Sequence, residues 1–366
     1  MTTIYLIRHA EAEGNLYRIA QGHTDGKVTK CGWAQIKALS KRFETIHVDA
    51  VYSSDLYRTC ATASAIYVPK GIPLHTDAAL REANLGVWEG LPWGEISRRD
   101  AEQLVRFSIQ PHLWHVQGGE TAAEVQDRLH RAVCRIGKKH DGEVVAISSH
   151  GFAIRMFLGK LQGYPLEKIG ESPQEDNTAV SMLELDGDKL RVVYRSDNSH
   201  LFALTGDGKK IVRKRGSVLE DGMYYEKPVL PKDQEMLLKM SADAYREAGE
   251  AWSCEGRTMT AVTERRALFG FNGETKPSAL LQMGKSGWIE ILYVNPEERK
   301  QGLGVQLIGQ AVQNTMEQGL TKLRIRLHKE NPAYALFREN DFVPVDQQLD
   351  GTVVMEKDLS CKADFS

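Results

Sequence analysis

Short apolar runs alternate with amphipathic stretches in the first part of the chain. The runs "TIYLIR" and "EVVAISSH" are apolar at consecutive positions, which is typical of strands buried on both faces of a sheet. The stretch "GWAQIKALSKRF" instead has apolar residues at helical spacing. Alternation of this kind predicts an α/β fold with a doubly wound, mainly parallel sheet. Strands are expected at 3–8, 49–54 and 143–150, and helices at 32–43, 55–66 and 151–161.

The pattern changes further along the chain. A hairpin is expected at 178–195, and the glycine-rich, charged segment 206–222 is interpreted as a linker because it lacks apolar periodicity. The elements expected after it are a helix at 232–249, strands at 266–271, 278–283 and 287–294, a helix at 303–318, a strand at 323–327, a helix from 332 and a hairpin around 350–351. This order predicts a separate α+β domain. We therefore expect one domain at 1–205 and a second at 223–366.

Length and charge limit the classes of function. A chain of 366 residues is too long for one ordinary domain. Its 47 Lys and Arg residues nearly balance its 49 Asp and Glu residues, so the net charge is −2. Such a balance gives no overall attraction to nucleic acid or to an anionic membrane. Any phosphate chemistry must therefore depend on a local concentration of cations.

The cysteines and the N-terminus favour the cytoplasm. The five cysteines form no CxxC pair, so the sequence indicates neither a zinc site nor a disulfide framework. The first residues lack a basic leader followed by an apolar core, and no run reaches the roughly 20 apolar residues that cross a bilayer. We expect a soluble cytoplasmic protein.

Two histidines follow predicted strands directly. Arg8 and His9 come after the strand at 3–8, and His150 comes after the strand at 143–150. Arg58 falls in the first turns of a helix that Ser53 or Ser54 is placed to cap. The carboxyl ends of parallel strands meet at one edge of a sheet, so these cations are expected to converge on an anion. A single histidine is more often a surface or capping residue, but the strand-end placement occurs twice.

Several separated blocks resemble one enzyme family. In order, they are "LIRHAEAEGN", "QGHTDGKVTKCGWAQ", "YSSDLYRTCATA", "LREANLGVWEG", "GGET" and "SSHG". Over residues 1–205 this series resembles the histidine phosphatase superfamily, also called phosphoglycerate-mutase-like. The resemblance implies that His9 attacks phosphorus to form a phosphohistidine without a metal ion.

The resemblance also implies roles for the remaining residues. Arg8, Arg58 and His150 would hold the phosphoryl oxygens, and Glu82 would protonate the leaving oxygen. The residues implied to line the substrate pocket are Asn15, Gln21 and Gly22.

Three details of this half leave alternatives open. Ala10 stands where the family most often has glycine, which predicts an ordinary backbone at that position. Glu82 could instead be a surface carboxylate paired with Arg81 or Arg98. The stretch from Glu82 to His150 is short, which favours a phosphatase over a mutase. A mutase, or a phospholigand receptor that cannot cleave, remains an alternative.

A second resemblance covers roughly residues 223–359. "VNPEERKQGLG" lies between a predicted strand and a helix, and "NPAYALFRENDF" follows later. The two stretches resemble motifs A and B of GNAT-type N-acetyltransferases. The resemblance implies acetyl-CoA, with its pyrophosphate on the amides of 299–304 and its pantetheine arm near Asn331. The residues implied to bind it are Leu292, Val294, Arg299, Lys300, Gln301, Gly302, Leu303, Gly304, Asn331 and Phe337.

The acid and base of this second reaction are less clear from the sequence. Alternation along a strand places Glu290 on one face with Leu292 and Val294, where it could deprotonate an amine or be a solvated carboxylate. Phe337 stands where many GNAT members have a tyrosine that protonates the departing thiolate. Tyr334, three residues earlier, could take that role.

We therefore expect a two-domain enzyme, a metal-independent phosphomonoesterase fused to an acetyl-CoA-dependent N-acetyltransferase. Its partners are expected to be a small phosphate ester and a small amine, with a homodimer left open. A rival hypothesis keeps the phosphatase and makes the second domain a CoA-binding sensor without turnover.

Overall fold

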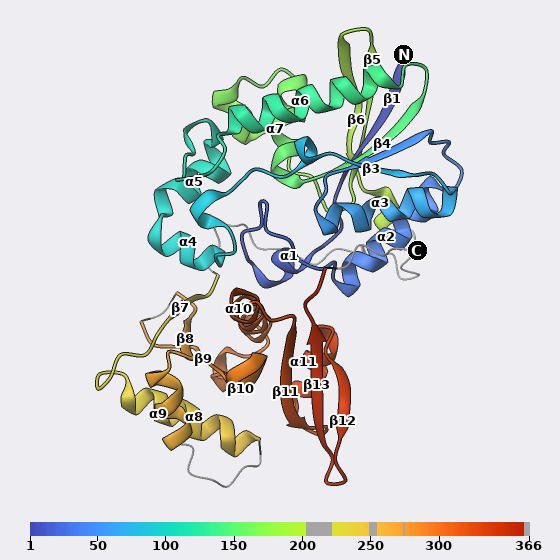
Figure 1. The fold of residues 1–366 in the computed structure, drawn as a ribbon. Coiled ribbons are helices and arrows are strands. Elements are labelled where there is room, and N and C mark those ends of the chain that lie inside the picture. Colours follow the sequence, from blue (N-terminus) through green and yellow to red (C-terminus); the bar gives the residue numbers. More distant parts are fainter. Residues whose placement is uncertain (203–221, 249–254, 274, 362–366) are drawn as a thin grey trace.

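The computed structural model describes residues 1–202, 222–248, 255–273 and 275–361, which form two domains, one above the other in Figure 1. The linker predicted at 206–222 lies outside the described residues apart from Gly222. The boundaries of the domains at 1–205 and 223–366 therefore stay predictions.

The first domain contains a six-stranded sheet with the order β3-β2-β4-β1-β5-β6. The first four strands in this order are parallel, and β5 and β6 are antiparallel to their neighbours. The strands are β1 Thr2–Arg8, β2 Ala50–Ser53, β3 Leu74–Thr76, β4 Val144–Ser149, β5 Val180–Asp186 and β6 Lys189–Asp197. The predicted α/β fold and the predicted hairpin, which is β5 and β6, are confirmed.

Helices cover both faces of this sheet. Residues of α2 and α3 pack with Ile7 of β1 on one face, and residues of α6 and α7 pack with Ile4 and Leu6 on the other. Successive residues of a strand point to opposite faces, so a strand covered on both sides is apolar throughout. The helices are α1 Glu13–Tyr17, α2 Lys30–Phe43, α3 Tyr57–Lys70, α4 Trp93–Arg99, α5 Ala101–Ile109, α6 Ala122–Lys139 and α7 Gly151–Leu161.

The predicted cap of α3 is wrong. The helix begins at Tyr57, one residue after Leu56, and neither Ser53 nor Ser54 caps it. The Tyr57 amide instead donates to the carboxylate of Asp25, which lies in a distant loop. The hydroxyl of Ser54 lies 2.8 Å from a ring nitrogen of His150. The side chain that could have capped the helix is therefore used in the candidate site.

The second domain contains a seven-stranded, mainly antiparallel sheet with the order β12-β13-β11-β10-β9-β8-β7. Only β10 and β11 are parallel, and they pair at just two positions. The strands are β7 Tyr224–Glu226, β8 Ala267–Phe271, β9 Ala279–Met283, β10 Trp288–Val294, β11 Lys322–His328, β12 Val343–Gln347 and β13 Thr352–Asp358. The helices are α8 Gln234–Glu247, α9 Glu255–Thr263, α10 Leu303–Glu317 and α11 Ala333–Glu339. This confirms the predicted α+β domain, although β7 and α9 were not expected.

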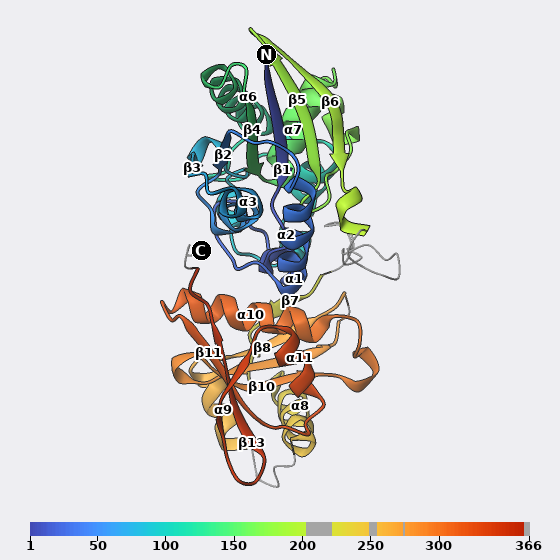
Figure 2. The same ribbon diagram turned by 90° about the vertical axis from the view of Figure 1, so that its right-hand side faces the viewer.

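The helix α10 lies between the second sheet and α1 of the first domain, as both ribbon views show (Figures 1 and 2). Tyr17 of α1 and Ile19 belong to the same apolar cluster as Leu307 and Ile308 of α10. The two domains therefore share a continuous apolar contact.

The remaining regular elements are short 3₁₀ turns. They are η1 Ala78–Leu80, η2 Gly86–Trp88, η3 Pro111–Leu113, η4 Leu166–Glu171, η5 Ser199–Phe202, η6 Lys285–Gly287 and η7 Pro296–Glu298. Over the described ranges, no helix is both long enough and apolar enough to span a bilayer.

Candidate active sites

The two strand-end histidines lie next to each other. In the register of β1 and β4, Arg8 is opposite Ser149, so the next residues, His9 and His150, leave the same edge of the sheet. Their ring centroids are 5.3 Å apart, and the residues are 5% and 0% exposed. The structure thus brings together two imidazoles that are separated by most of the first domain's sequence.

The ring of His9 is held in one orientation. Its Nδ1 lies 2.7 Å from the carbonyl oxygen of Ala10. A carbonyl only accepts, so Nδ1 carries a proton, and in the neutral ring Nε2 is the nitrogen that keeps a lone pair. The side chain of Asn177 donates to the His9 carbonyl at 2.8 Å, which fixes the main chain. Ala10 is not among the residues with positive φ, as expected for an ordinary backbone.

His150 is buried against hydroxyl groups and cations. Its Nε2 lies 2.8 Å from the Ser54 hydroxyl, which also contacts Thr59 at 2.8 Å. Burial, followed by the charges of Arg58 and His9, holds the pKa of His150 well below its ordinary value. The ring is therefore neutral near pH 7, and its N–H group can donate a hydrogen bond to a phosphoryl oxygen.

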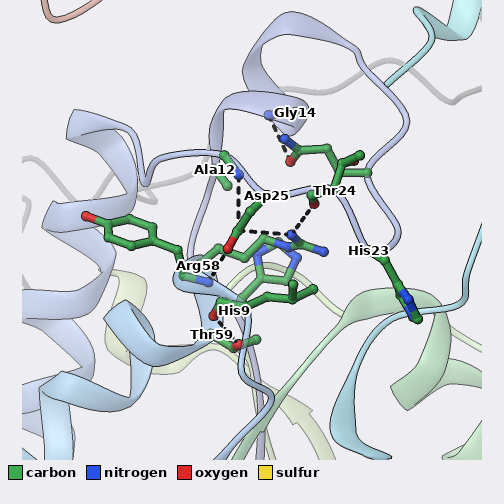
Figure 3. Close-up of polar contacts among 12 residues, drawn as sticks. His9, Ala12, Gly14, His23, Thr24, Asp25, Arg58 and Thr59 are labelled. Atoms are coloured by element: carbon green, nitrogen blue, oxygen red, sulfur yellow. Dashed lines mark hydrogen bonds and ion pairs between the residues drawn. The ribbon is translucent and has the colours of Figure 1, made fainter. Parts of the chain in front are cut away.

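Arg58 is 1% exposed and is held by the loop that begins at Gln21. Its guanidinium donates to the carbonyls of Gly22 at 2.7 Å and Thr24 at 2.9 Å, and it lies 3.4 Å from a carboxylate oxygen of Asp25. Figure 3 shows Arg58 beside His9, with Thr24 and Asp25 around the guanidinium. Burial lowers the pKa of Arg58 most, and the charges of Asp25 and Glu82 oppose this effect.

Arg8 lies against Gly151, the residue that follows His150. A Cβ on Gly151 would be 3.0 Å from its guanidinium carbon, so this group rests on the start of α7. One Nη of Arg8 donates to the main-chain carbonyl of Glu175. Burial raises the pKa of Glu175, whose carboxylate is bound by Arg195 at 2.7 Å.

The carboxylate of Glu82 accepts from the first turn of α7. The amides of Phe152 and Ala153 donate to it at 3.0 and 2.8 Å. Glu82 is 8% exposed, and Arg81 and Arg98 pair with other carboxylates. The alternative of a surface ion pair is therefore wrong for Glu82.

The predicted pocket residues Asn15, Gln21 and Gly22 belong to α1 and the loop after it. The Gln21 side chain accepts from the Gly14 amide at 3.2 Å. The carboxylate of Glu89 accepts from the amides of Gly22, His23 and Thr24 and so holds the loop. Burial opposes ionisation of Glu89, but these hydrogen bonds outweigh it, and its pKa is lowered.

In the second domain, the turn before α10 has unusual backbone angles. Lys300 has φ 64°, and Gly302 has φ 85°. A Cβ on Gly302 would meet nothing within 4 Å, so the backbone angle and not space favours glycine. Within the described part of the chain, no acceptor is found for the main-chain amides from Lys300 to Gly304. This turn can therefore hold an anion such as a pyrophosphate.

Arg299, at the start of this turn, is engaged elsewhere. Its Nη2 donates to both carboxylate oxygens of Glu247 on α8 at 2.7 and 2.9 Å, and its Nε donates to the Val294 carbonyl. The main chain of the turn, with Gln301 and Leu303, is thus better placed than the Arg299 guanidinium to hold a ligand.

The predicted alternation fails at Glu290. A register shift lies between Ile289 and Ile291, and these residues pack into different apolar clusters, with Leu292 on the side of Ile289. This β-bulge breaks the period of two on which a shared face for Glu290, Leu292 and Val294 depends. The Glu290 carboxylate, 35% exposed, accepts from Gln282 at 2.6 Å and lies 3.6 Å from Arg266.

The residues of α11 are split between core and surface. Phe337 is 1% exposed and packs edge-on against Phe342 at 5.0 Å, so it is a core residue and not a ligand contact. Tyr334 is only partly buried against the same cluster. The Asn331 side chain accepts from the Ala333 amide at 2.8 Å, just before the start of α11.

Two family models match the chain. The model of the histidine phosphatase superfamily (branch 1) matches residues 4–198, which is more than half of the chain. The chain belongs to this superfamily. The model of the acetyltransferase (GNAT) family matches residues 245–342, within the second domain.

Relatives in this superfamily match the first domain of the chain. Phosphoserine phosphatase 1 of Hydrogenobacter thermophilus is 29% identical over 55% of this chain and 95% of its own length. Phosphoglycerate mutase-like protein 4 of Arabidopsis thaliana is 34% identical over 54% of this chain and 86% of its own length. The solved structure of Bacillus stearothermophilus YhfR is 35% identical, with a TM-score of 0.53 over 55% of this chain and 99% of that chain.

The sequence analysis did not predict a role in this site for four residues, Asp25, Glu89, Ser54 and Asn177. Asp25 and Glu89 fall inside blocks that carry the resemblance, so their position was a usable signal. Ser54 was assigned to a helix cap. Asn177 lies far from His9 in the sequence, and no local pattern marks it. Among the described residues, no group of His, Cys, Asp and Glu could hold a metal ion.

Proposed function

We propose that the first domain is a phosphomonoesterase that works through a phosphohistidine on His9. The observation that carries this proposal is the pair of buried rings of His9 and His150, 5.3 Å apart, with Arg58 beside His9 (Figure 3). Two buried imidazoles, the buried guanidinium of Arg58 and the half-buried guanidinium of Arg8 at one sheet edge suit a tetrahedral dianion.

The reaction takes place in two displacements. First, Nε2 of His9 attacks phosphorus, and the P–N bond forms as the P–O bond to the alcohol breaks. Glu82 gives a proton to the leaving oxygen. A water molecule then attacks phosphorus, Glu82 takes back a proton, and the P–N bond breaks to release phosphate. Arg8, Arg58 and His150 hold the phosphoryl oxygens throughout.

The test is hydrolysis of p-nitrophenyl phosphate by the full chain, with acid-stable and acid-labile phosphoenzyme measured after rapid quenching. We expect turnover and an acid-labile phosphoenzyme in the wild type, and neither in His9→Ala. Transfer of phosphate between two positions of one substrate, without net hydrolysis, would support the mutase instead. Binding of phosphate esters without turnover would support the receptor.

We propose that the second domain is an N-acetyltransferase that uses acetyl-CoA. The supporting observation is the turn from Lys300 to Gly304, whose amides face no acceptor among the described residues and fit a pyrophosphate. When bound, acetyl-CoA supplies an acetyl group as a thioester. Glu290, directly or through water, accepts a proton from the amine. Tyr334 is the remaining candidate for giving a proton to the thiolate, since Phe337 has no proton to give.

Two measurements separate this transferase from a CoA-binding sensor. Calorimetry with CoA tests binding, and a thiol-release assay with acetyl-CoA and a panel of small amines tests turnover. We expect both binding and thiol release. Binding without release from any amine favours the sensor, and the absence of binding rejects both.

A further inference from the structure

We propose that Lys357, a residue of the acetyltransferase domain, positions the phosphatase site. This inference rests on the phosphatase function proposed above. It concerns α1, the short helix that follows His9 and that both domains contact (Figures 1 and 2).

On one side, α1 is tied to the main chain of His9. The Asn15 side chain accepts from the Ala12 amide at 3.1 Å and from the Asn177 side chain at 3.4 Å. The same Asn177 nitrogen donates to the carbonyl of His9 at 2.8 Å. A movement of α1 is therefore passed to the histidine through the Asn177 side chain.

The helix α1 is also tied to the loop that holds Arg58. The main chain of Glu13 donates to the Lys27 carbonyl at 2.8 Å, and the Lys27 amide donates to the Glu13 carboxylate at 3.4 Å. Lys27 ends the loop whose carbonyls at Gly22 and Thr24 bind the Arg58 guanidinium. The position of Glu13 therefore affects the loop that contains the predicted pocket residues Gln21 and Gly22. Through this loop it also affects the Arg58 guanidinium.

On its other side, α1 rests on the second domain. Tyr17 is 2% exposed and packs in the apolar cluster of α10. A Cβ on Gly309 would lie 2.4 Å from the Cβ of Tyr17, so the two helices touch where residue 309 has no side chain. Contact this close transmits small shifts, because packed interiors are not easily compressed.

Lys357 of β13 connects the two sides. It is 1% exposed, and its Nζ lies 2.7 Å from a carboxylate oxygen of Glu13. The same Nζ donates to the Asn340 carbonyl at 3.0 Å and lies 3.8 Å from Asp341, both of which follow α11. Loss of the ammonium would leave Glu13 buried without a cation, so α1 would move to rehydrate it.

The test uses the full chain with Lys357→Met. The matched control is Lys322→Met, which removes an exposed lysine of the same sheet that pairs with Glu356 at 2.9 Å. Below the onset of unfolding, we expect Lys357→Met to raise KM for p-nitrophenyl phosphate about tenfold with kcat changed less than about twofold. The dissociation constant of inorganic phosphate, measured by calorimetry, should rise by a similar factor. The control should change neither quantity.

A double-mutant cycle with Glu13→Gln covers the case in which Lys357→Met folds poorly. Removing both charges leaves no buried ion without a partner, so the double variant should fold. Its KM should be no higher than that of Glu13→Gln alone, because both changes break the same link. A lower melting temperature with unchanged KM, or additive effects on KM, would overturn the inference. If the wild type binds phosphate without hydrolysing esters, the proposed function fails, while the binding measurements still decide on Lys357.

Discussion

The two candidate sites differ in what holds their residues in place. His9, Arg58 and His150 are at most 5% exposed, and each has a polar partner from a distant part of the first domain. Glu290 of the second domain is 35% exposed, and the turn before α10 offers main-chain amides. When a buried polar group loses its partner, water cannot take the partner's place. Water can take the place of a partner that an exposed group loses. The phosphatase site should therefore be much less tolerant of substitution.

The largest effect is expected for Arg58→Met. The change removes a cation from the phosphate and leaves the carbonyls of Gly22 and Thr24 without their donor. We expect kcat/KM for p-nitrophenyl phosphate to fall about a thousandfold. The free energy of unfolding should fall by about 1–3 kcal/mol, as for buried acceptors that lose their donor. Steady-state kinetics and urea unfolding measure the two effects.

The control for this change is Arg191→Met, which removes an exposed arginine paired with Glu184. It should cost at most about 1 kcal/mol and leave hydrolysis unchanged. If Arg58→Met retained wild-type hydrolysis, burial would not make the first site less tolerant of substitution than the second.

The sequence predicted the elements and the strand-end histidines because both depend on local patterns. Alternating apolar runs locate β1 and β4, and the rule for parallel strands then brings His9 and His150 to one edge. The partners of these histidines are not local. Asn177 reaches the site only through the loop after η4, and nothing near it in the sequence indicates its role. Ser54 lies inside a block that carries the resemblance, but its place before a helix suggested a cap instead of a contact with His150.

Local patterns also misled in the second domain. Alternation placed Glu290 with Leu292, but the bulge between Ile289 and Ile291 interrupts it. Motif matching placed Phe337 against the cofactor, but this ring is fully buried against Phe342. A bulge and a core contact are tertiary features, so periodicity and spacing do not reveal them.

A smaller effect is expected for Glu290→Gln. Glutamine has the same shape and keeps a polar contact with Gln282, so folding should not change. If Glu290 accepts the proton of the amine, kcat for thiol release should fall about a hundredfold. Glu264→Gln is the matched control, because Glu264 also pairs with Arg266, at 2.8 Å, and is similarly exposed. Equal activity of the two variants would assign proton removal to water.

Gly302→Val tests the turn before α10. A β-branched residue is strained at φ 85°, so the backbone should relax and turn its amides away from the ligand. We expect the dissociation constant of CoA, measured by calorimetry, to rise about tenfold. Gly319→Val carries the same strain at φ 71°, also in open space, but at the far end of α10. If both variants bind CoA like the wild type, the turn does not hold the pyrophosphate.

The smallest effect is expected for the pH dependence of folding stability that the buried His150 causes. The pKa of His150 is lower in the folded protein than its ordinary value of 6.5, so the unfolded chain binds a proton that the folded protein excludes. The stabilising contribution is complete above pH 6.5 and is lost as the pH falls toward the folded pKa. The unfolding free energy of the wild type should therefore fall by up to about 1.4 kcal/mol per pH unit more steeply than that of His150→Gln. Urea unfolding between pH 7.5 and about 5 measures both slopes, and equal slopes would mean that His150 is protonated as readily in the fold as in the unfolded chain.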